Sequence, residues 1–186
     1  MQTKITSYFN NTNSSINSSI NSSINSNINK KTIKSNLKKS ICIYTDGSCR
    51  NNGKKNAIAG IGVYIENICK ISEPIVGRQT NQRAELFAIL KALQIINISD
   101  YSEINIYTDS KYSINCITNW INLWLKNNWL DKKKQPIKNK DIIQSIHNIY
   151  KKYNNIHLIH ILAHTNNKDI HSIGNSIADQ LANQVK

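Results

Sequence analysis

Residues 41–50 of the chain read ICIYTDGSCR, an apolar run that leads into an aspartate. The β-branched and aromatic residues of the 41–46 stretch predict a strand, with Asp46 at its end. The same ending recurs at 107–109, where the sequence YTD closes a second apolar run over 104–108. If the two strands are parallel neighbours, Asp46 and Asp109 meet at one edge of a sheet, which is where open α/β sheets bind ligands.

The rest of residues 41–186 alternates between strand-like and helix-like patterns. We predict further strands at 57–66, 67–76 and 156–162, and helices at 80–96, 110–126, 141–153 and 176–185. A break is expected near Trp120, and a basic loop is expected at 132–140. This order predicts an α/β domain in which a five-stranded mixed sheet is flanked by helices.

Two more acidic residues stand in apolar surroundings. Glu85 lies in the segment AEL at 84–86, and Asp179 lies in IADQL at 177–181. A carboxylate in an apolar setting needs a partner, and several carboxylates gathered at one place need a hard divalent cation. Taken singly, each acid is better explained as a helix cap or as the partner of one of the 24 Lys and Arg residues.

The composition favours an acidic partner for this chain. Its 186 residues include 24 Lys and Arg against 11 Asp and Glu, a net charge of +13, which favours nucleic acid. The longest run free of strongly polar residues, 57–65, is too short to span a bilayer, and the N-terminus lacks the apolar core of a secretory signal. No C-x-x-C pair occurs among the four cysteines, so we expect reduced thiols and an intracellular protein.

Seven blocks of sequence become informative when they are taken together. They are YTDGSCRNNG (44–53), AGIGVY (59–64), GRQTNQRAEL (77–86), YTDS (107–110), ITNW (117–120), AHT (163–165) and GNSIADQLA (174–182). In order and spacing these blocks resemble the type 1 ribonuclease H family, specifically its eukaryotic catalytic domain. The resemblance covers residues 41–186 and implies an RNase H-like fold there.

The resemblance implies an endoribonuclease that hydrolyses the RNA strand of RNA–DNA hybrids, leaves 5′-phosphate and 3′-hydroxyl ends, and serves in primer or R-loop removal. The family's metal-binding carboxylates fall on Asp46, Glu85, Asp109 and Asp179, which would hold two Mg²⁺ ions, with Mn²⁺ as a substitute. Its proton-transfer histidine falls on His164. The interval from His164 to Asp179 is longer than in the family and contains a rival histidine, His171.

A non-catalytic protein is the alternative interpretation of the same sequence. It would bind hybrids, or act as a sliding-clamp adaptor, without cleaving RNA. Such an adaptor need not keep all four acids, and this chain has them. The carboxylate set therefore favours the enzyme.

The resemblance also implies how the two strands of a hybrid are held. The RNA-strand contacts fall on Cys49, Asn52, Asn81 and Gln82. The DNA-strand contacts fall on Arg78, Thr80 and Asn139 around a phosphate, and on Tyr112, Trp120 and Trp124 against deoxyribose. Without the resemblance, Asn52 would indicate an ordinary turn, and the two tryptophans would be core residues at helical spacing. Lysines within 126–138 would add salt-sensitive affinity that is independent of sequence.

Residues 1–40 lie outside the resemblance and carry six lysines and no acid. Gln2, Ile5, Tyr8 and Phe9 fit the pattern Q-x-x-I-x-x-Y-F of a PIP box, the peptide that docks on the sliding clamp PCNA. We expect residues 10–40 to form a disordered Asn/Ser/Ile-rich linker with lysine pairs. The chain is thereby divided into a PIP-box-like peptide at 1–9, this linker, and an RNase H catalytic domain at 41–186.

These features predict a monomer that works in the nucleus or wherever DNA is replicated. A mitochondrial transit peptide is the alternative for the tail, which is acid-free and Ser-rich but has no arginine before Arg50. An inert tail is the remaining alternative.

Overall fold

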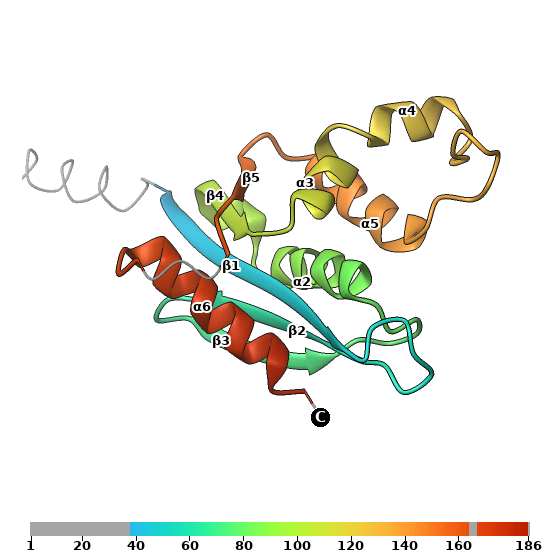
Figure 1. Cartoon of the computed structure of the whole chain (residues 1–186). Coiled ribbons are helices and arrows are strands. Elements are labelled where there is room, and N and C mark those ends of the chain that lie inside the picture. The colour runs from blue at the N-terminus through green and yellow to red at the C-terminus, as the bar shows by residue number, and fades with distance from the viewer. Residues whose placement is uncertain (1–37, 164–166, 186) are drawn as a thin grey trace, which may run out of the picture. The chain divides into compact units, whose positions relative to one another are not determined.

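Five strands form one mixed sheet in the computed structural model, which describes residues 38–163 and 167–185 (Figure 1). The strands are β1 (Lys39–Arg50), β2 (Ile58–Ile65), β3 (Cys69–Pro74), β4 (Tyr101–Thr108) and β5 (Ile156–His160), in the spatial order β3-β2-β1-β4-β5. The pairs β1–β2 and β2–β3 are antiparallel, whereas β1–β4 and β4–β5 are parallel. The predicted five-stranded mixed sheet is confirmed.

The helices are α2 (Asn81–Ile95), α3 (Lys111–Thr118), α4 (Ile121–Lys126), α5 (Lys140–Tyr150) and α6 (Ile170–Asn183), with a short 3₁₀ turn at Ile98–Asp100. Among the described residues, no helix is both long and apolar enough to cross a membrane. The predicted break near Trp120 is confirmed, because α3 ends at Thr118 and α4 begins at Ile121.

The two largest differences from the predicted boundaries are the start of the last helix and the end of the first strand. The last helix begins at Ile170 rather than at residue 176, because the Asp169 side chain accepts hydrogen bonds from the backbone N–H groups of His171 and Ser172 and so caps it. Gly174 disfavours a helix locally, but its missing side chain lets α6 lie against the ring of Tyr44. The first strand is also longer than 41–46, since its pairing with β2 continues as far as Arg50.

The sheet separates an aliphatic layer from an aromatic one. On the side of α2, α3 and α5, the main core includes Ile43 and Ile106 from the sheet and Leu86 and Ile143 from the helices, all of them fully buried. On the side of α6, the ring of Tyr44 stacks between those of Tyr64 and Tyr107, with centroid separations of 5.9 and 5.2 Å. This packing holds the sheet and the helices in one fixed arrangement.

Two glycines let helices approach opposite faces of the sheet. A Cβ placed on Gly47 would lie 2.1 Å from the backbone nitrogen of Glu85 in α2, and one on Gly62 would lie 1.9 Å from the carbonyl oxygen of Ala178 in α6. Such distances are far below van der Waals contact, so any larger residue would push the helix away. Gly47 therefore determines how near α2 comes to β1, and Gly62 how near α6 comes to β2.

We predict that Gly62→Ala destabilises the protein by about 1–3 kcal/mol, because α6 must move off the sheet to admit the methyl group. Urea unfolding followed by circular dichroism measures the change. Ser176→Ala, on the exposed side of the same helix, is the control and should leave the unfolding midpoint almost unchanged. An unaltered midpoint for Gly62→Ala would contradict the close packing described here.

Candidate active site

The four predicted carboxylates line one cavity of about 410 Å³ just beyond the point where the parallel pairing of β1 with β4 ends. Tyr44 pairs with Tyr107 in the parallel ladder, and two residues further along each chain stand Asp46 and Asp109. Helix α2 carries Glu85 to the same place, and α6 carries Asp179. The prediction that these acids gather at one edge of the sheet is confirmed by this geometry.

Negative charge is crowded in this cavity. Asp46 is 8% exposed, and its burial, followed by the nearby charge of Asp109, raises the pKa of its carboxyl well above the ordinary value. The backbone N–H of Gly47 donates to Oδ1 of Asp46 at 2.8 Å and opposes this rise only in part. Asp179 adds a further negative charge and a hydrogen bond that both favour the protonated form of Asp46. The site is therefore electrostatically costly without a cation.

Glu85 is held by two side chains from different elements. The Ser110 hydroxyl donates to Oε2 of Glu85, and Nδ2 of Asn81 donates to Oε1 at 2.7 Å. Burial raises the pKa of Glu85, as does the charge of Asp109, while these two hydrogen bonds lower it. The carboxylate is thus fixed in direction before any ligand arrives.

The donor set suits a hard divalent cation. The acids that line the cavity offer only oxygen, and their mutual repulsion is what a divalent ion would relieve. Within the described ranges, no group of three or more His, Cys, Asp or Glu residues is by itself arranged to enclose an ion.

Two of the four predicted RNA-strand residues border the same cavity. Cys49 and Asn81 line it, whereas Asn52 lies in the exposed turn after β1, and Gln82 is exposed on α2. Asn52 and Gln82 are therefore not brought to the carboxylates in this structure.

Sequence reasoning missed two residues that hold the acids in place. Ser110 fixes Glu85 as described above, and Nδ2 of Asn183 donates to Oδ1 of Asp179 at 2.8 Å. The contact of Asn183 with Asp179 could have been predicted from the sequence, because residues four positions apart on one helix have neighbouring side chains. The hydrogen bond of Ser110 joins residues 25 positions apart and could be found only in three dimensions.

Four of the six predicted DNA-strand residues form a row of neighbouring side chains. Burial raises the pKa of Tyr112 and the nearby Asn139 side chain opposes this rise, so these two side chains lie close together. The Tyr112 ring lies edge-on to that of Trp120 with a centroid separation of 6.0 Å, and the ring centroids of Trp120 and Trp124 lie 5.8 Å apart. Trp120 is 40% exposed, while Trp124 is half-buried against the core, so the alternative of core residues at helical spacing holds only for part of the pair. The structure also places Thr80 at the N-cap of α2 and leaves Arg78 exposed.

The family model described as RNase H matches residues 38–186 of the chain. The chain belongs to the RNase H family. Ribonuclease H1 of Mus musculus is 37% identical over 148 residues, which cover 78% of this chain and 50% of the mouse protein. Ribonuclease H of Clostridium botulinum is 35% identical over 150 residues, which cover 78% of this chain and 95% of that protein.

A solved structure is also similar to this RNase H family member. The foamy viral protease-reverse transcriptase in complex with RNA/DNA hybrid matches it with a TM-score of 0.62 and 26% identity, over 79% of this chain and 20% of that one. The chain spans about half the length of the mouse relative. The RNase H-like fold predicted from sequence is confirmed.

The two histidines weighed from sequence have different outcomes. His164 lies outside the described residues, so its position is not assigned. His171 hydrogen-bonds the Tyr44 hydroxyl at 3.2 Å and stacks on Tyr107 with a centroid separation of 4.3 Å. It precedes Asp179 by two helical turns, about 12 Å, and does not line the cavity of this RNase H-family protein. His171 therefore helps to anchor α6 rather than to complete the acidic cluster.

We predict that the metal-free protein loses stability as the pH rises. The pKa of Asp46 is higher in the folded than in the unfolded protein, so the stability linked to its proton is present below the unfolded pKa and is lost as the pH rises through the folded pKa. Asp46→Asn should therefore unfold at a higher temperature than the wild type in EDTA at about pH 9, with a smaller difference at about pH 5.

Thermal unfolding followed by circular dichroism measures both values. Asp100→Asn is the control, because Asp100 is exposed beyond the amino end of β4, away from the cavity. Equal unfolding temperatures for Asp46→Asn and the wild type at alkaline pH would contradict the charge crowding.

Proposed function

We propose that this chain is an endoribonuclease that hydrolyses the RNA strand of RNA–DNA hybrids and leaves 5′-phosphate and 3′-hydroxyl ends. The observation that carries the proposal is the convergence of four carboxylates, from β1, α2, β4 and α6, on one cavity. The relatives named Ribonuclease H and Ribonuclease H1 support the activity, and the similar viral protein solved with an RNA/DNA hybrid supports the substrate class.

The cofactor of the proposed reaction is a pair of Mg²⁺ ions, for which Mn²⁺ can substitute. Asp46, Glu85, Asp109 and Asp179 would hold them, and the ions when bound would activate a water and stabilise the leaving 3′-oxygen. Hydrogen bonds from Ser110 and Asn81 fix the orientation of the Glu85 carboxylate, and a hydrogen bond from Asn183 fixes that of Asp179. Because the carboxylates are oriented beforehand, little reorganisation is needed when the hybrid binds.

The two strands of the hybrid would be told apart by their sugars. Cys49 and Asn81 stand beside the carboxylates, where a 2′-hydroxyl can be read by polar groups. The row from Tyr112 through Trp120 to Trp124 offers deoxyribose an aromatic surface whose rings are inclined to one another by 64° and 57°. His164 remains the predicted proton-transfer residue on sequence grounds.

We expect cleavage of an RNA–DNA hybrid in Mg²⁺ and none of DNA–DNA or RNA–RNA duplexes. Asp46→Asn should lower the rate at least about 100-fold, because Lewis-acid stabilisation of the transition state contributes several kcal/mol, while hybrid binding persists. Gel analysis of an end-labelled RNA strand measures cleavage, and Asp100→Asn serves as a control with wild-type activity.

Full activity of Asp46→Asn would rule out the proposed metal role. Tight hybrid binding by the wild type without any cleavage would favour the non-catalytic adaptor instead.

The proposal extends to the cellular role of the enzyme. Residues 1–9 would dock a monomeric enzyme on the sliding clamp PCNA at sites of DNA replication in the nucleus, for primer or R-loop removal. This step rests on the sequence pattern of Gln2, Ile5, Tyr8 and Phe9, which lie outside the described residues. Aromatic anchors on a short peptide are a compact way to fill an apolar pocket.

A Tyr8→Ala/Phe9→Ala variant should bind purified PCNA at least about tenfold more weakly, because it loses two aromatic anchors of the kind that dominate interface energies. Its cleavage of free hybrid should equal that of the wild type. Isothermal titration calorimetry measures the affinity, and Thr3→Ala, at a variable position of the motif, is the matched control. Equal clamp affinity of the double variant and the wild type would remove the docking role and leave the transit peptide or the inert tail.

A further inference from the structure

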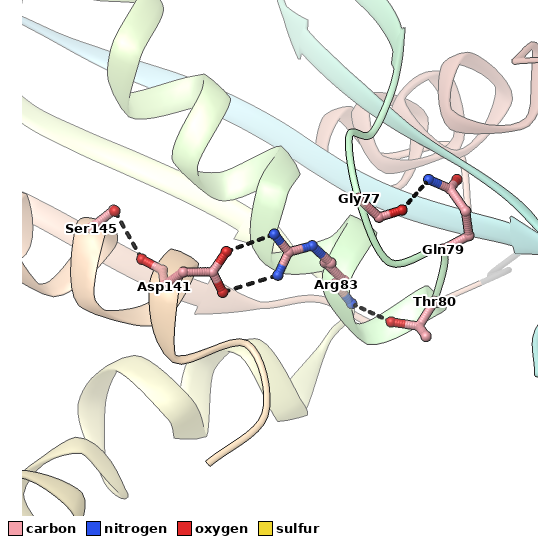
Figure 2. Close-up of polar contacts among 6 residues, drawn as sticks. All are labelled: Gly77, Gln79, Thr80, Arg83, Asp141 and Ser145. Carbon is pink, nitrogen blue, oxygen red and sulfur yellow. Dashed lines mark hydrogen bonds and ion pairs between the residues drawn. The ribbon is translucent and has the colours of Figure 1, made fainter. Parts of the chain in front are cut away.

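A bidentate ion pair between Arg83 and Asp141 joins the first turns of α2 and α5 (Figure 2). Nη1 of Arg83 donates to Oδ1 of Asp141 at 3.0 Å, and Nη2 donates to Oδ2 at 2.6 Å. The partners lie 58 positions apart in sequence, and the Arg83 side chain is only 15% exposed. Paired guanidinium and carboxylate groups of this kind fix direction as well as distance. The pair therefore sets the gap between two helix N-termini.

Each of these helix ends carries a residue assigned above to the DNA strand. Thr80 caps α2, and its Oγ1 accepts a hydrogen bond from the backbone N–H of Arg83 at 3.3 Å (Figure 2). Asn139 precedes α5 in a left-handed conformation with φ of 59°, and its side chain does not cap its own helix. It lies instead near the Tyr112 hydroxyl, whose pKa it lowers against the larger raising effect of burial, and so it adjoins the aromatic row. Both side chains are thus held at helix ends that Arg83 and Asp141 tie together.

The turn that carries Arg78 is anchored on two sides. Nε2 of Gln79 donates to the carbonyl oxygen of Gly77 at 2.8 Å (Figure 2). It also donates to the carbonyl oxygen of Ile75 at 3.0 Å, and Oε1 of Gln79 accepts from the backbone N–H of Ala59 in β2 at 2.7 Å. On the other side, a Cβ on Gly77 would lie 4.0 Å from Nη2 of Arg83. The Arg83 guanidinium therefore lies near this turn while it holds Asp141.

We infer that Arg83 and Asp141 are positioning residues for the DNA strand, whose ion pair holds Thr80 and Asn139 at the separation needed to bind one phosphate between them. The inference rests on the proposed function. Asp141 repels phosphate by charge, so direct binding does not explain an acid at this place. Both terminal nitrogens of Arg83 are engaged by Asp141, so the pair acts on the phosphate site through the two helix ends.

The test compares Asp141→Asn and Arg83→Met with Glu73→Gln in steady-state cleavage of an RNA–DNA hybrid. Glu73→Gln is the matched control, since it breaks another ion pair of α2, that of Lys91 with Glu73 at 2.8 Å, far along the helix from Thr80. We expect KM to rise about 3- to 10-fold in Asp141→Asn and Arg83→Met, because one or two side chains must then be ordered when the hybrid binds. We expect kcat to stay within about twofold of the wild-type value. The double variant should be no worse than either single one, because both remove the same pair.

A second arm separates positioning from a general loss of stability. Hybrids with a single neutral methylphosphonate, moved along the DNA strand, should reveal one position at which the wild type loses affinity. Asp141→Asn should be insensitive to the substitution at that position and respond like the wild type elsewhere. Asp141→Glu, which keeps the charge, should recover part of the wild-type KM.

Three outcomes would overturn the inference: an unchanged KM in both variants, an equal rise for Glu73→Gln, or a methylphosphonate effect in Asp141→Asn identical to that in the wild type. Circular dichroism verifies folding, and Asp141, whose side chain is 61% exposed, tolerates an amide on steric grounds. Equilibrium binding of the same hybrids repeats the comparison independently of cleavage. If the wild type bound but cleaved no hybrid, the proposed function would fail while the binding data still decided this inference.

Discussion

The close approach of two helices to opposite faces of one strand pair is the constraint on which this structure depends. Gly47 and Gly62 leave no room for a side chain, so α2 and α6 come near enough to bring Glu85 and Asp179 to the end of β1. The sheet register supplies Asp46 and Asp109 at the same edge. A small displacement of either helix would separate the carboxylates, because packed interiors transmit shifts rather than absorb them.

The clustered carboxylates that the proposed function needs also destabilise the folded protein. Burial and neighbouring negative charges disfavour the ionised form of Asp46, so the assembled cluster costs free energy in the absence of a cation. The aliphatic core on the α2 side and the stacked tyrosines under α6 offset that cost. A cluster that is unfavourable alone has a large affinity to gain from a divalent ion, which explains why the fold maintains it.

The side chains proposed to bind the DNA strand are likewise held in place before the hybrid binds. Thr80 and Asn139 belong to different helices, yet one ion pair and one anchored turn determine their separation. Tyr112 continues this arrangement into the exposed Trp120. In the proposed function, the excess of positive charge on the chain would attract a polyanion without specifying its position, and these directed contacts would supply the position.

Local pattern determined much of this protein. The alternating apolar runs predicted the five strands, and the YTD endings predicted which edge of the sheet would hold Asp46 and Asp109. The start of α6 was missed although its cap, Asp169, is a local signal, because Gly174 disfavours a helix and its fit against the ring of Tyr44 is not visible along the chain. Nor did local pattern reveal that Ser110 orients Glu85 or that Arg83 binds Asp141. Those contacts join residues far apart in sequence, and only the packing of the helices on the sheet brings them within hydrogen-bonding distance.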